Sequence, residues 1–291
     1  MKKRTRRAAA ILLLLGVSIS VGWMGWRDTT QPILHTVYVE VPGLRREYRI
    51  LQVTDLHSGM FGVGQAAIAA LVAGRRFDAV VMTGDLVLAH GETAEPALEL
   101  ARALTRTSAV LAFTKGNHDD STVGQGLAEL GVAYLDTTGP VRADGLLLES
   151  PALPATTTDN AALLIIAAHD PPSPDALAKM THEGSPPTLV LSGHTHGGQF
   201  RLPLLGGIIC PPTDQTEGKF LLLPELRGVR VEGAFRDGLT ESYISPGLGS
   251  SKMGYGLPSW VRFRLGERAE LTEIVVRGPS PDGSRQATQA R

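Results

Sequence analysis

Five short apolar runs in this chain are each followed by polar residues of the types that bind metals or transfer protons. The runs cover residues 50–53, 79–82, 110–113, 163–167 and 189–191. The polar residues after them are Asp55, His57, Asp85, Asn117, His118, Asp119, His169, His194 and His196. Short β-branched and aliphatic runs predict buried strands. Because the carboxyl ends of parallel strands open onto one crevice, we expect these side chains to lie together.

Helical spacing between the runs predicts an α/β fold. We expect helices over residues 65–75, 94–106 and 123–130, and further strands over 36–41, 243–245, 261–265 and 271–276. Residues 150–160 and 170–175 have the composition of loops. Alternation of strands with helices is typical of a sheet covered by helices. The chain is expected to contain a linker and leading strand at 27–48, one domain at 49–277 and a disordered tail at 278–291.

Composition excludes several classes of protein. The chain has 28 basic and 29 acidic side chains, a formal net charge of −1, and therefore lacks the basic excess of nucleic-acid-binding proteins. Hydrophobic residues make up 43% of the sequence, which excludes a wholly disordered chain. The single cysteine, Cys210, excludes an internal disulfide and a zinc site built from several cysteines.

The first 26 residues predict an insertion signal outside the folded domain. The basic residues at the start are Lys2, Lys3, Arg4, Arg6 and Arg7. They precede an uncharged stretch over 8–26 that just reaches bilayer length, a pattern that a buried core helix fits less well. We favour an uncleaved membrane anchor, and a signal sequence cleaved at Ser18-Ile19-Ser20 is the alternative. In both cases the basic end stays in the cytoplasm and the rest lies on the extracytoplasmic side.

Histidine placement predicts a metal centre. Five of the eight histidines follow the apolar runs, together with carboxylates and one amide. This nitrogen and oxygen ligand set suits Mn, Fe or Zn better than Ca. It is too large for one tetrahedral zinc ion and suits two metals about 3.5–4 Å apart. A carboxylate such as Asp85 would bridge the pair.

The order of these motifs resembles a known family. Asp55-x-His57, Gly84-Asp85, Gly116-Asn117-His118-Asp119, a lone His169 and Gly193-His194-Thr195-His196 are similar to the signature of calcineurin-like metallophosphoesterases. The resemblance runs from about residue 49 to 276, and the Gly-Gly-Gln that follows His196 looks like the membrane-anchored or exported bacterial branch. It implies a four-layer α-β-β-α sandwich of two central sheets flanked by helices.

The resemblance also implies roles for individual residues. One metal would be held by Asp55, His57, Asp85 and His196, and the other by Asp85, Asn117, His169 and His194. His118 would act as general acid or stabilise transition-state charge, and Asp119 would orient it. A hydroxide bridging the metals would be the nucleophile.

Two segments depart from the family pattern. Ser245-Pro246-Gly247 lacks an arginine that usually follows the serine and might have met substrate phosphate. Residues 211–230 look like an insertion with an apolar run at 220–224. We expect this insertion either to touch a membrane or lipid substrate, or to form a strand that covers a sheet edge. His35, His90 and His182 follow none of the five runs and are expected to be ordinary solvated or hydrogen-bonded side chains.

Three functional hypotheses follow. The first is a two-metal phosphoester hydrolase of phosphodiesterase or phosphatase type. A narrower version is a pyrophosphatase for a lipid-linked nucleotide such as UDP-diacylglucosamine, although such enzymes work on the cytoplasmic face. The second is a non-catalytic metal-binding interaction module. The third, a β-lactamase-like zinc hydrolase, is excluded because Gly-Gly-Gln follows His194-Thr195-His196.

Overall fold

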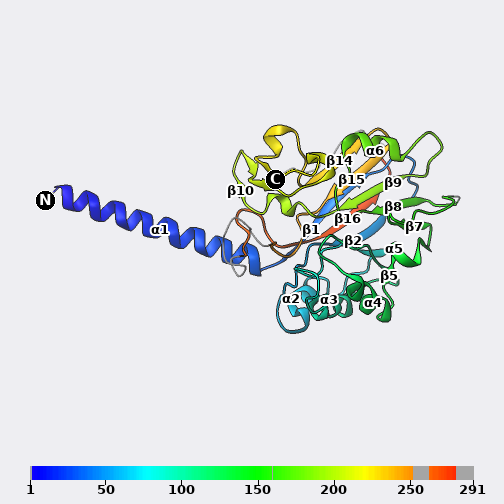
Figure 1. Cartoon of the computed structure of the whole chain (residues 1–291), viewed down its shortest axis with the longest axis horizontal. Coiled ribbons are helices and arrows are strands. Elements are labelled where there is room, and N and C mark those ends of the chain that lie inside the picture. The colour runs from blue at the N-terminus through cyan, green and yellow to red at the C-terminus, as the bar shows by residue number, and fades with distance from the viewer. Residues whose placement is uncertain (1, 159, 252–261, 280–291) are drawn as a thin grey trace.

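Two stacked six-stranded sheets form the centre of the molecule (Figure 1). The computed structural model describes residues 2–158, 160–251 and 262–279. The first sheet has, in spatial order, β1 Ile33–Glu40, β16 Glu270–Arg277, β2 Tyr48–Val53, β3 Ala79–Met82, β4 Leu111–Phe113 and β5 Ala133–Tyr134. The second has β14 Gly233–Asp237, β15 Thr240–Ile244, β9 Thr188–Ser192, β8 Leu163–Ala167, β7 Leu146–Glu149 and β6 Val141–Ala143. The strands before the polar motifs are parallel to one another within each sheet, so their carboxyl ends share an edge.

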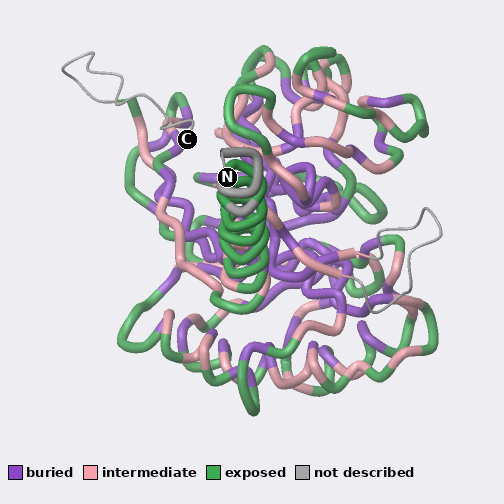
Figure 2. Tube along the Cα trace, turned by 90° about the vertical axis from the view of Figure 1, so that its left-hand side faces the viewer, coloured by how far each residue is buried: buried purple, intermediate pink, exposed green. Residues whose placement is uncertain are grey.

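Helices cover the outer faces of both sheets. The helices α2 Ala66–Leu71, α3 Glu95–Leu104 and α4 Ser121–Glu129 lie on the first sheet, and α6 Pro174–Met180 lies on the second; a short helix, α5, spans Leu135–Thr138. Apolar side chains fill the space between sheet and helices on each side, and a further cluster with Ile50, Ile165 and Leu191 fills the space between the sheets. Figure 2 shows this buried interior in purple. These layers confirm the expected α-β-β-α sandwich.

Helix α1, Lys2–Thr30, projects from the domain. Its segment Ala9–Thr30 is long and apolar enough to cross a membrane, a test that a signal sequence near an N-terminus also passes. The helix continues four residues beyond the predicted boundary at residue 26, and the leading strand β1 begins three residues after it ends. The region expected to be a linker is therefore partly helical.

Most of the predicted strands form, with shifts at their ends. The runs 79–82 and 163–167 coincide with β3 and β8, and the other runs lie in β2, β4 and β9 with shifts of one or two residues. The helix expected over 65–75 is shorter: α2 ends at Leu71, and turns follow up to Gly74, which has a left-handed φ of 73°. The loop expected over 170–175 already contains the start of α6 at Pro174.

Two expectations at the end of the chain fare differently. The strand predicted at 261–265 is wrong over its described part, residues 262–265, which form only one bridge, between Leu265 and Phe200. The tail predicted at 278–291 lies outside the described residues from residue 280 onward.

A lobe of short elements follows the second sheet's β9. It contains the strands β10 Arg201–Leu202, β11 Gly206–Gly207, β12 Ile209–Cys210 and β13 Leu221–Leu222, and single turns of 3-10 helix at Asp214–Thr216 and Glu225–Arg227. Further single turns of 3-10 helix cover Val63–Gln65 and His196–Gly198. The apolar run of the insertion pairs as β13 with β12, in a ribbon separate from both large sheets. The expectation that this run covers a sheet edge is therefore wrong for the described strands.

Candidate metal centre

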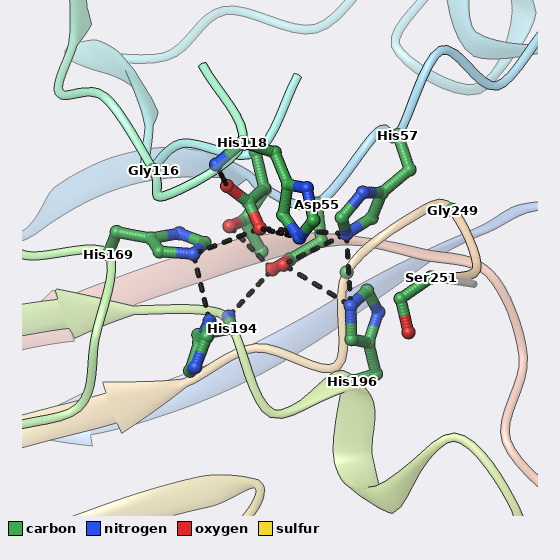
Figure 3. Close-up of polar contacts among 12 residues, drawn as sticks. Asp55, His57, Gly116, His118, His169, His194, His196, Gly249 and Ser251 are labelled. Carbon is green, nitrogen blue, oxygen red and sulfur yellow. Dashed lines mark hydrogen bonds and ion pairs between the residues drawn. The ribbon is translucent and has the colours of Figure 1, made fainter. Parts of the chain in front are cut away.

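The polar motifs converge at the carboxyl ends of strands from both sheets (Figure 3). Asp55 and His57 follow β2, Asp85 follows β3, and Asn117 and His118 follow β4. From the second sheet, His169 follows β8, and His194 and His196 follow β9. All the predicted ligands thus lie around one point, although they are up to 141 positions apart in the sequence, from Asp55 to His196. Asp119 lies behind this group, in the loop that follows β4.

Unusual backbone geometry turns these side chains inward. The φ angles of Asp55, His57, Asp85, His194 and His196 are all left-handed, between 46° and 69°. Residues other than glycine rarely adopt this region, and where they do so together the strain commonly marks a functional site. The loops therefore hold a conformation that their sequences alone disfavour.

Three glycines let the loops approach one another closely. Gly84 has a φ of 90°, so it makes a left-handed turn directly before Asp85. Gly116 and Gly193 do not need glycine for their φ angles; a Cβ at Gly116 would overlap the Asp85 carboxylate, and one at Gly193 would overlap the Thr54 hydroxyl. Their role is close packing around the carboxylates rather than a left-handed turn.

One group of ligating atoms consists of Asp55, His57 and His196. The Nε2 atoms of the two histidines lie 3.0 Å apart, and Asp55 Oδ1 lies 3.7 Å from His57 Nε2 and 3.6 Å from His196 Nε2. Asp55 Oδ2 accepts hydrogen bonds from Thr54 Oγ1 and the His194 amide, whereas the buried Oδ1 has no hydrogen-bond partner. A buried carboxylate oxygen left unpaired is costly, and a cation held by these three residues would satisfy it.

A second group consists of Asp85, His169 and His194, with Asn117 beside it. His169 Nε2 lies 3.2 Å from Asp85 Oδ2, 3.1 Å from His194 Nδ1 and 3.2 Å from Asn117 Oδ1. Asp85 Oδ2 is also 3.7 Å from His57 Nε2, so this one oxygen lies between the two groups.

The outer nitrogens of two histidines determine which nitrogen can bind a metal. His169 Nδ1 is 2.8 Å from the Thr83 carbonyl oxygen, and His194 Nε2 is 2.9 Å from that of Pro212. A carbonyl oxygen can only accept, so in the neutral rings these nitrogens carry the proton. The lone pairs of His169 Nε2 and His194 Nδ1 then point inward, the arrangement found in metal-binding histidines.

The electrostatics of the centre favour a bound cation. Burial would raise the pKa of Asp85, but the charge of His169 outweighs it and holds the pKa at about 2. Burial likewise acts to lower the pKa of His169, and the Asp85 carboxylate outweighs it and raises the pKa to about 9. Burial lowers the pKa of His196 to about 3, so that imidazole is neutral. The buried carboxylates thus stay ionised and draw positive charge, which a divalent cation can supply in place of the His169 proton.

His118 lies at the edge of the centre and is half-buried. Its ring centroid is 5.1 Å from that of His57, and its Nε2 is 3.8 Å from Asp85 Oδ2. Asp119 does not orient this ring as the resemblance implied. Asp119 Oδ1 accepts from the amides of Leu86 and Val87, and Oδ2 accepts from the amide of Gly116. Asp119 therefore ties the loop after β3 to the loop after β4.

A cavity of about 370 Å³ opens over the centre. Asp85, Asn117, His118, His194 and His196 line its polar side. The apolar part of its lining comes from the lobe after β9: Phe200, Ile209, Pro211, Pro212 and Phe220. A ligand bound at the polar side would thus have its remaining part against an apolar wall.

Comparison with known proteins assigns this geometry to a family. The family model for calcineurin-like phosphoesterases matches residues 48–198. The chain belongs to this family. It is 29% identical over 232 residues to the uncharacterized metallophosphoesterase YkuE of Bacillus subtilis, covering 71% of this chain and 73% of that protein. It is 26% identical over 256 residues to the phosphodiesterase YaeI of Escherichia coli, covering 79% and 82%. The protein is therefore a metal-dependent phosphoesterase.

The structure adds supporting residues of the phosphoesterase that its sequence did not reveal. Arg264 is fully buried, and its guanidinium donates to the carbonyl oxygens of His196 at 3.1 Å, Pro246 at 2.7 Å and Gly249 at 2.6 Å. It thereby fixes the backbone of a proposed ligand. The sequence does not indicate this role of Arg264, because the residue falls in an alternating segment that predicts a strand.

The three remaining histidines all have hydrogen-bond partners. His90 Nε2 is 3.0 Å from the Asn117 carbonyl oxygen, to which it must donate, so this exposed residue helps to hold the loop of a proposed ligand. His35 contacts the buried Glu270, and His182 contacts Ser185. All three therefore agree with the expectation of ordinary solvated or hydrogen-bonded side chains, and His90 in addition contacts the loop of a proposed ligand.

Replacing Arg264 by methionine should destabilise the protein markedly. The variant keeps the length of the side chain but leaves the carbonyls of His196, Pro246 and Gly249 without their donor, which should lower the free energy of unfolding by about 3 kcal/mol. Urea unfolding followed by circular dichroism measures it. Arg45→Met, at an exposed arginine, is the matched control and should change little. Equal stability of the two variants would contradict the supporting role of Arg264.

Proposed function

We propose that the chain is a two-metal phosphoester hydrolase. One metal is held by Asp55, His57, Asp85 and His196, and the other by Asp85, Asn117, His169 and His194. The observation that carries the proposal is the position of Asp85 Oδ2, within 3.7 Å of His57 Nε2 on one side and 3.2 Å of His169 Nε2 on the other. A single carboxylate oxygen between two groups of histidines fits a bridge between two cations. Imidazole and carboxylate ligands suit Mn, Fe or Zn.

The residues around the centre have different roles in the proposed reaction. The bound metals would supply the nucleophile by lowering the pKa of a water molecule that they share. Asp85 and Asp55 remain ionised and hold the positive charge in place, and Asp119 and Arg264 hold the loops. The presence of His118 at the cavity, beside a complete set of ligands, favours catalysis over a non-catalytic metal-binding module.

His118 has two candidate roles, and its environment favours one. Burial lowers the pKa of His118, so the ring is neutral at neutral pH. A neutral ring can donate an N–H hydrogen bond to a phosphate oxygen and stabilise the charge that develops in the transition state. Full proton transfer to the leaving oxygen would need the imidazolium, which becomes populated only as the pH falls.

Substitution Asp85→Asn should abolish most of the activity, since it removes the charge of the bridging ligand. We expect the rate of hydrolysis of bis-p-nitrophenyl phosphate with manganese to fall at least about a hundredfold in the full-length protein. Metal content, measured by elemental analysis, should fall from two ions per chain. Chelator treatment of the unmodified protein should abolish the rate and manganese should restore it. Asp175→Asn, at an exposed aspartate, is the control. An active Asp85→Asn protein would rule out the bridge.

Substitution His118→Asn separates catalysis from metal binding. Because His118 lies outside both ligand sets, turnover should fall about a hundredfold while both metals remain bound. Parallel kinetics and elemental analysis test this, with His182→Asn as a control at an exposed histidine. Loss of metal from His118→Asn would show that this residue is a ligand.

The substrate is proposed to be a phosphodiester with an apolar substituent. The apolar wall of the cavity that the proposed metal ligands also line supports this, as does the phosphodiesterase name of the Escherichia coli relative. The wall also supports the expectation that the insertion at 211–230 touches a lipid substrate. A pyrophosphatase for a lipid-linked nucleotide stays a narrower alternative.

Phe220→Ala should weaken the preference for apolar substituents. The phenyl side chain lines the cavity, so its removal should lower kcat/KM for butyl p-nitrophenyl phosphate about tenfold, while kcat/KM for methyl p-nitrophenyl phosphate changes little. Leu222→Ala is the matched control, since Leu222 lies in the same ribbon but outside the cavity lining. If both substrates lost the same factor, the wall would not determine specificity.

We propose that α1 anchors the phosphoesterase in the cell membrane with its catalytic domain on the extracytoplasmic side, or that the domain is exported after cleavage. The cluster of cations before the apolar stretch supports this orientation. The length and apolar composition of Ala9–Thr30 support the anchor.

A further inference from the structure

Helix α1 joins the domain without a flexible linker. Asp28, in its last turn, is fully buried. Asp28 Oδ2 accepts from the Gly266 amide at 2.9 Å, and the Asp28 carbonyl accepts from the Ala269 amide at 2.7 Å. One residue further on, Thr29 Oγ1 accepts from the Arg264 amide at 2.8 Å. These contacts fix the direction in which α1 leaves the domain, so an anchored helix also fixes how the domain faces the bilayer.

Exposed apolar side chains gather in one part of the domain. Outside α1, eleven large hydrophobic residues are exposed in the described chain, and six of them lie between Leu202 and Leu226. Leu204 is completely exposed, at 102%, and Leu226 is 61% exposed. Scattered exposed leucines are normal on soluble proteins, whereas a gathered group marks a surface that binds something.

This apolar group lies beside the point where α1 leaves the domain. One hollow is lined by Met24 and Arg27 of α1 and by the loop Leu202, Pro203, Leu204 and Leu205 together with Leu226. Figure 1 shows β10, which leads into this loop, on the side of the domain from which α1 projects. The loop therefore reaches the level of the last turns of the helix.

The same turns of α1 carry side chains that are typical of a helix at the membrane interface. Trp23 and Trp26 are 58% and 55% exposed, and the Arg27 guanidinium lies 5.4 Å from the ring centroid of Trp23. Tryptophan and arginine at the end of an apolar helix are typical of the headgroup region. A loop level with Met24 would then face the lipid directly.

We propose that residues 202–205, together with Leu226, insert into the outer surface of the bilayer beside α1 and seat the domain on the membrane. The occupant of this surface is lipid rather than another protein, because the fixed direction of α1 brings the bilayer to it. Apolar side chains at the headgroup boundary gain by leaving water. The inference rests on the proposed anchoring of α1 and is independent of the proposed chemistry at the metal centre.

Depth-dependent fluorescence quenching tests the seating in the full-length protein. Single cysteines are introduced by Ile19→Cys in α1, Leu204→Cys in the loop and Leu239→Cys on the turn that packs against Ala178 of α6. Leu239 is 57% exposed, and Figure 1 shows α6 away from α1. Each protein is labelled with an environment-sensitive maleimide and reconstituted into phosphatidylcholine nanodiscs with or without lipids spin-labelled near the headgroup. The unmodified chain is the blank, since Cys210 is fully buried.

The three positions give distinct outcomes. The proposal expects spin-labelled lipid to quench the label at Leu204→Cys at least about twofold more than the label at Leu239→Cys, with quenching also at Ile19→Cys. Quenching at Ile19→Cys with equal values at the other two positions would overturn the seating and leave the anchor intact. Absence of quenching at all three would overturn both. Hydrolysis measured on the same samples reports on the proposed function separately.

Discussion

The metal centre depends on two carboxylates that are buried and remain ionised. Asp55 and Asp85 are almost completely inaccessible, at 0% and 1%, and burial of a carboxylate is unfavourable unless positive charge or hydrogen bonds compensate it. Asp85 Oδ1 accepts from the His118 amide, and Asp55 Oδ2 from Thr54 and the His194 amide. The oxygens that remain, Asp55 Oδ1 and Asp85 Oδ2, are those that face the imidazoles. One oxygen of each carboxylate thus accepts hydrogen bonds from the protein's own donors, and the other oxygen remains available to a cation.

This constraint explains why the surrounding loops are so closely packed. Each carboxylate needs backbone amides from another strand's loop: the His118 amide comes from the loop after β4, and the His194 amide from the loop after β9 of the other sheet. Such contacts require the loops to approach within hydrogen-bonding distance, which a side chain at Gly116 or Gly193 would prevent. The stacking of the two sheets therefore brings the loops together, and the glycines allow each carboxylate to accept hydrogen bonds from the amides of another loop.

The sequence predicts the fold and the proposed ligands because both depend on local patterns. The run 79–82 is apolar, bounded by Asp78 and Thr83, and forms β3 as expected; the motif residues follow from their places after such runs. Arg264 and His90 could not be predicted in this way, since each acts on the backbone of a residue distant in sequence, His196 or Asn117. The contact of Asp119 also differs from the expectation, because its carboxylate accepts from the amides of Leu86, Val87 and Gly116 rather than from the ring of His118. Short paired strands such as β12 and β13 were missed, since two residues carry no periodicity.

The contacts of Arg264 link the end of α1 to the candidate metal centre. Its backbone amide donates to Thr29 Oγ1 at the end of α1, and its guanidinium donates to the His196 carbonyl. One buried residue thus contacts both the end of the helix and the backbone of a proposed ligand. Cleavage at Ser18-Ile19-Ser20 would leave Asp28 and Thr29 in place, so the joint between helix and domain does not depend on whether the N-terminal segment is retained. Under the proposed anchoring and seating, cleavage would change the attachment to the bilayer: only the exposed leucines would hold the domain there, and these contribute far less than a spanning helix.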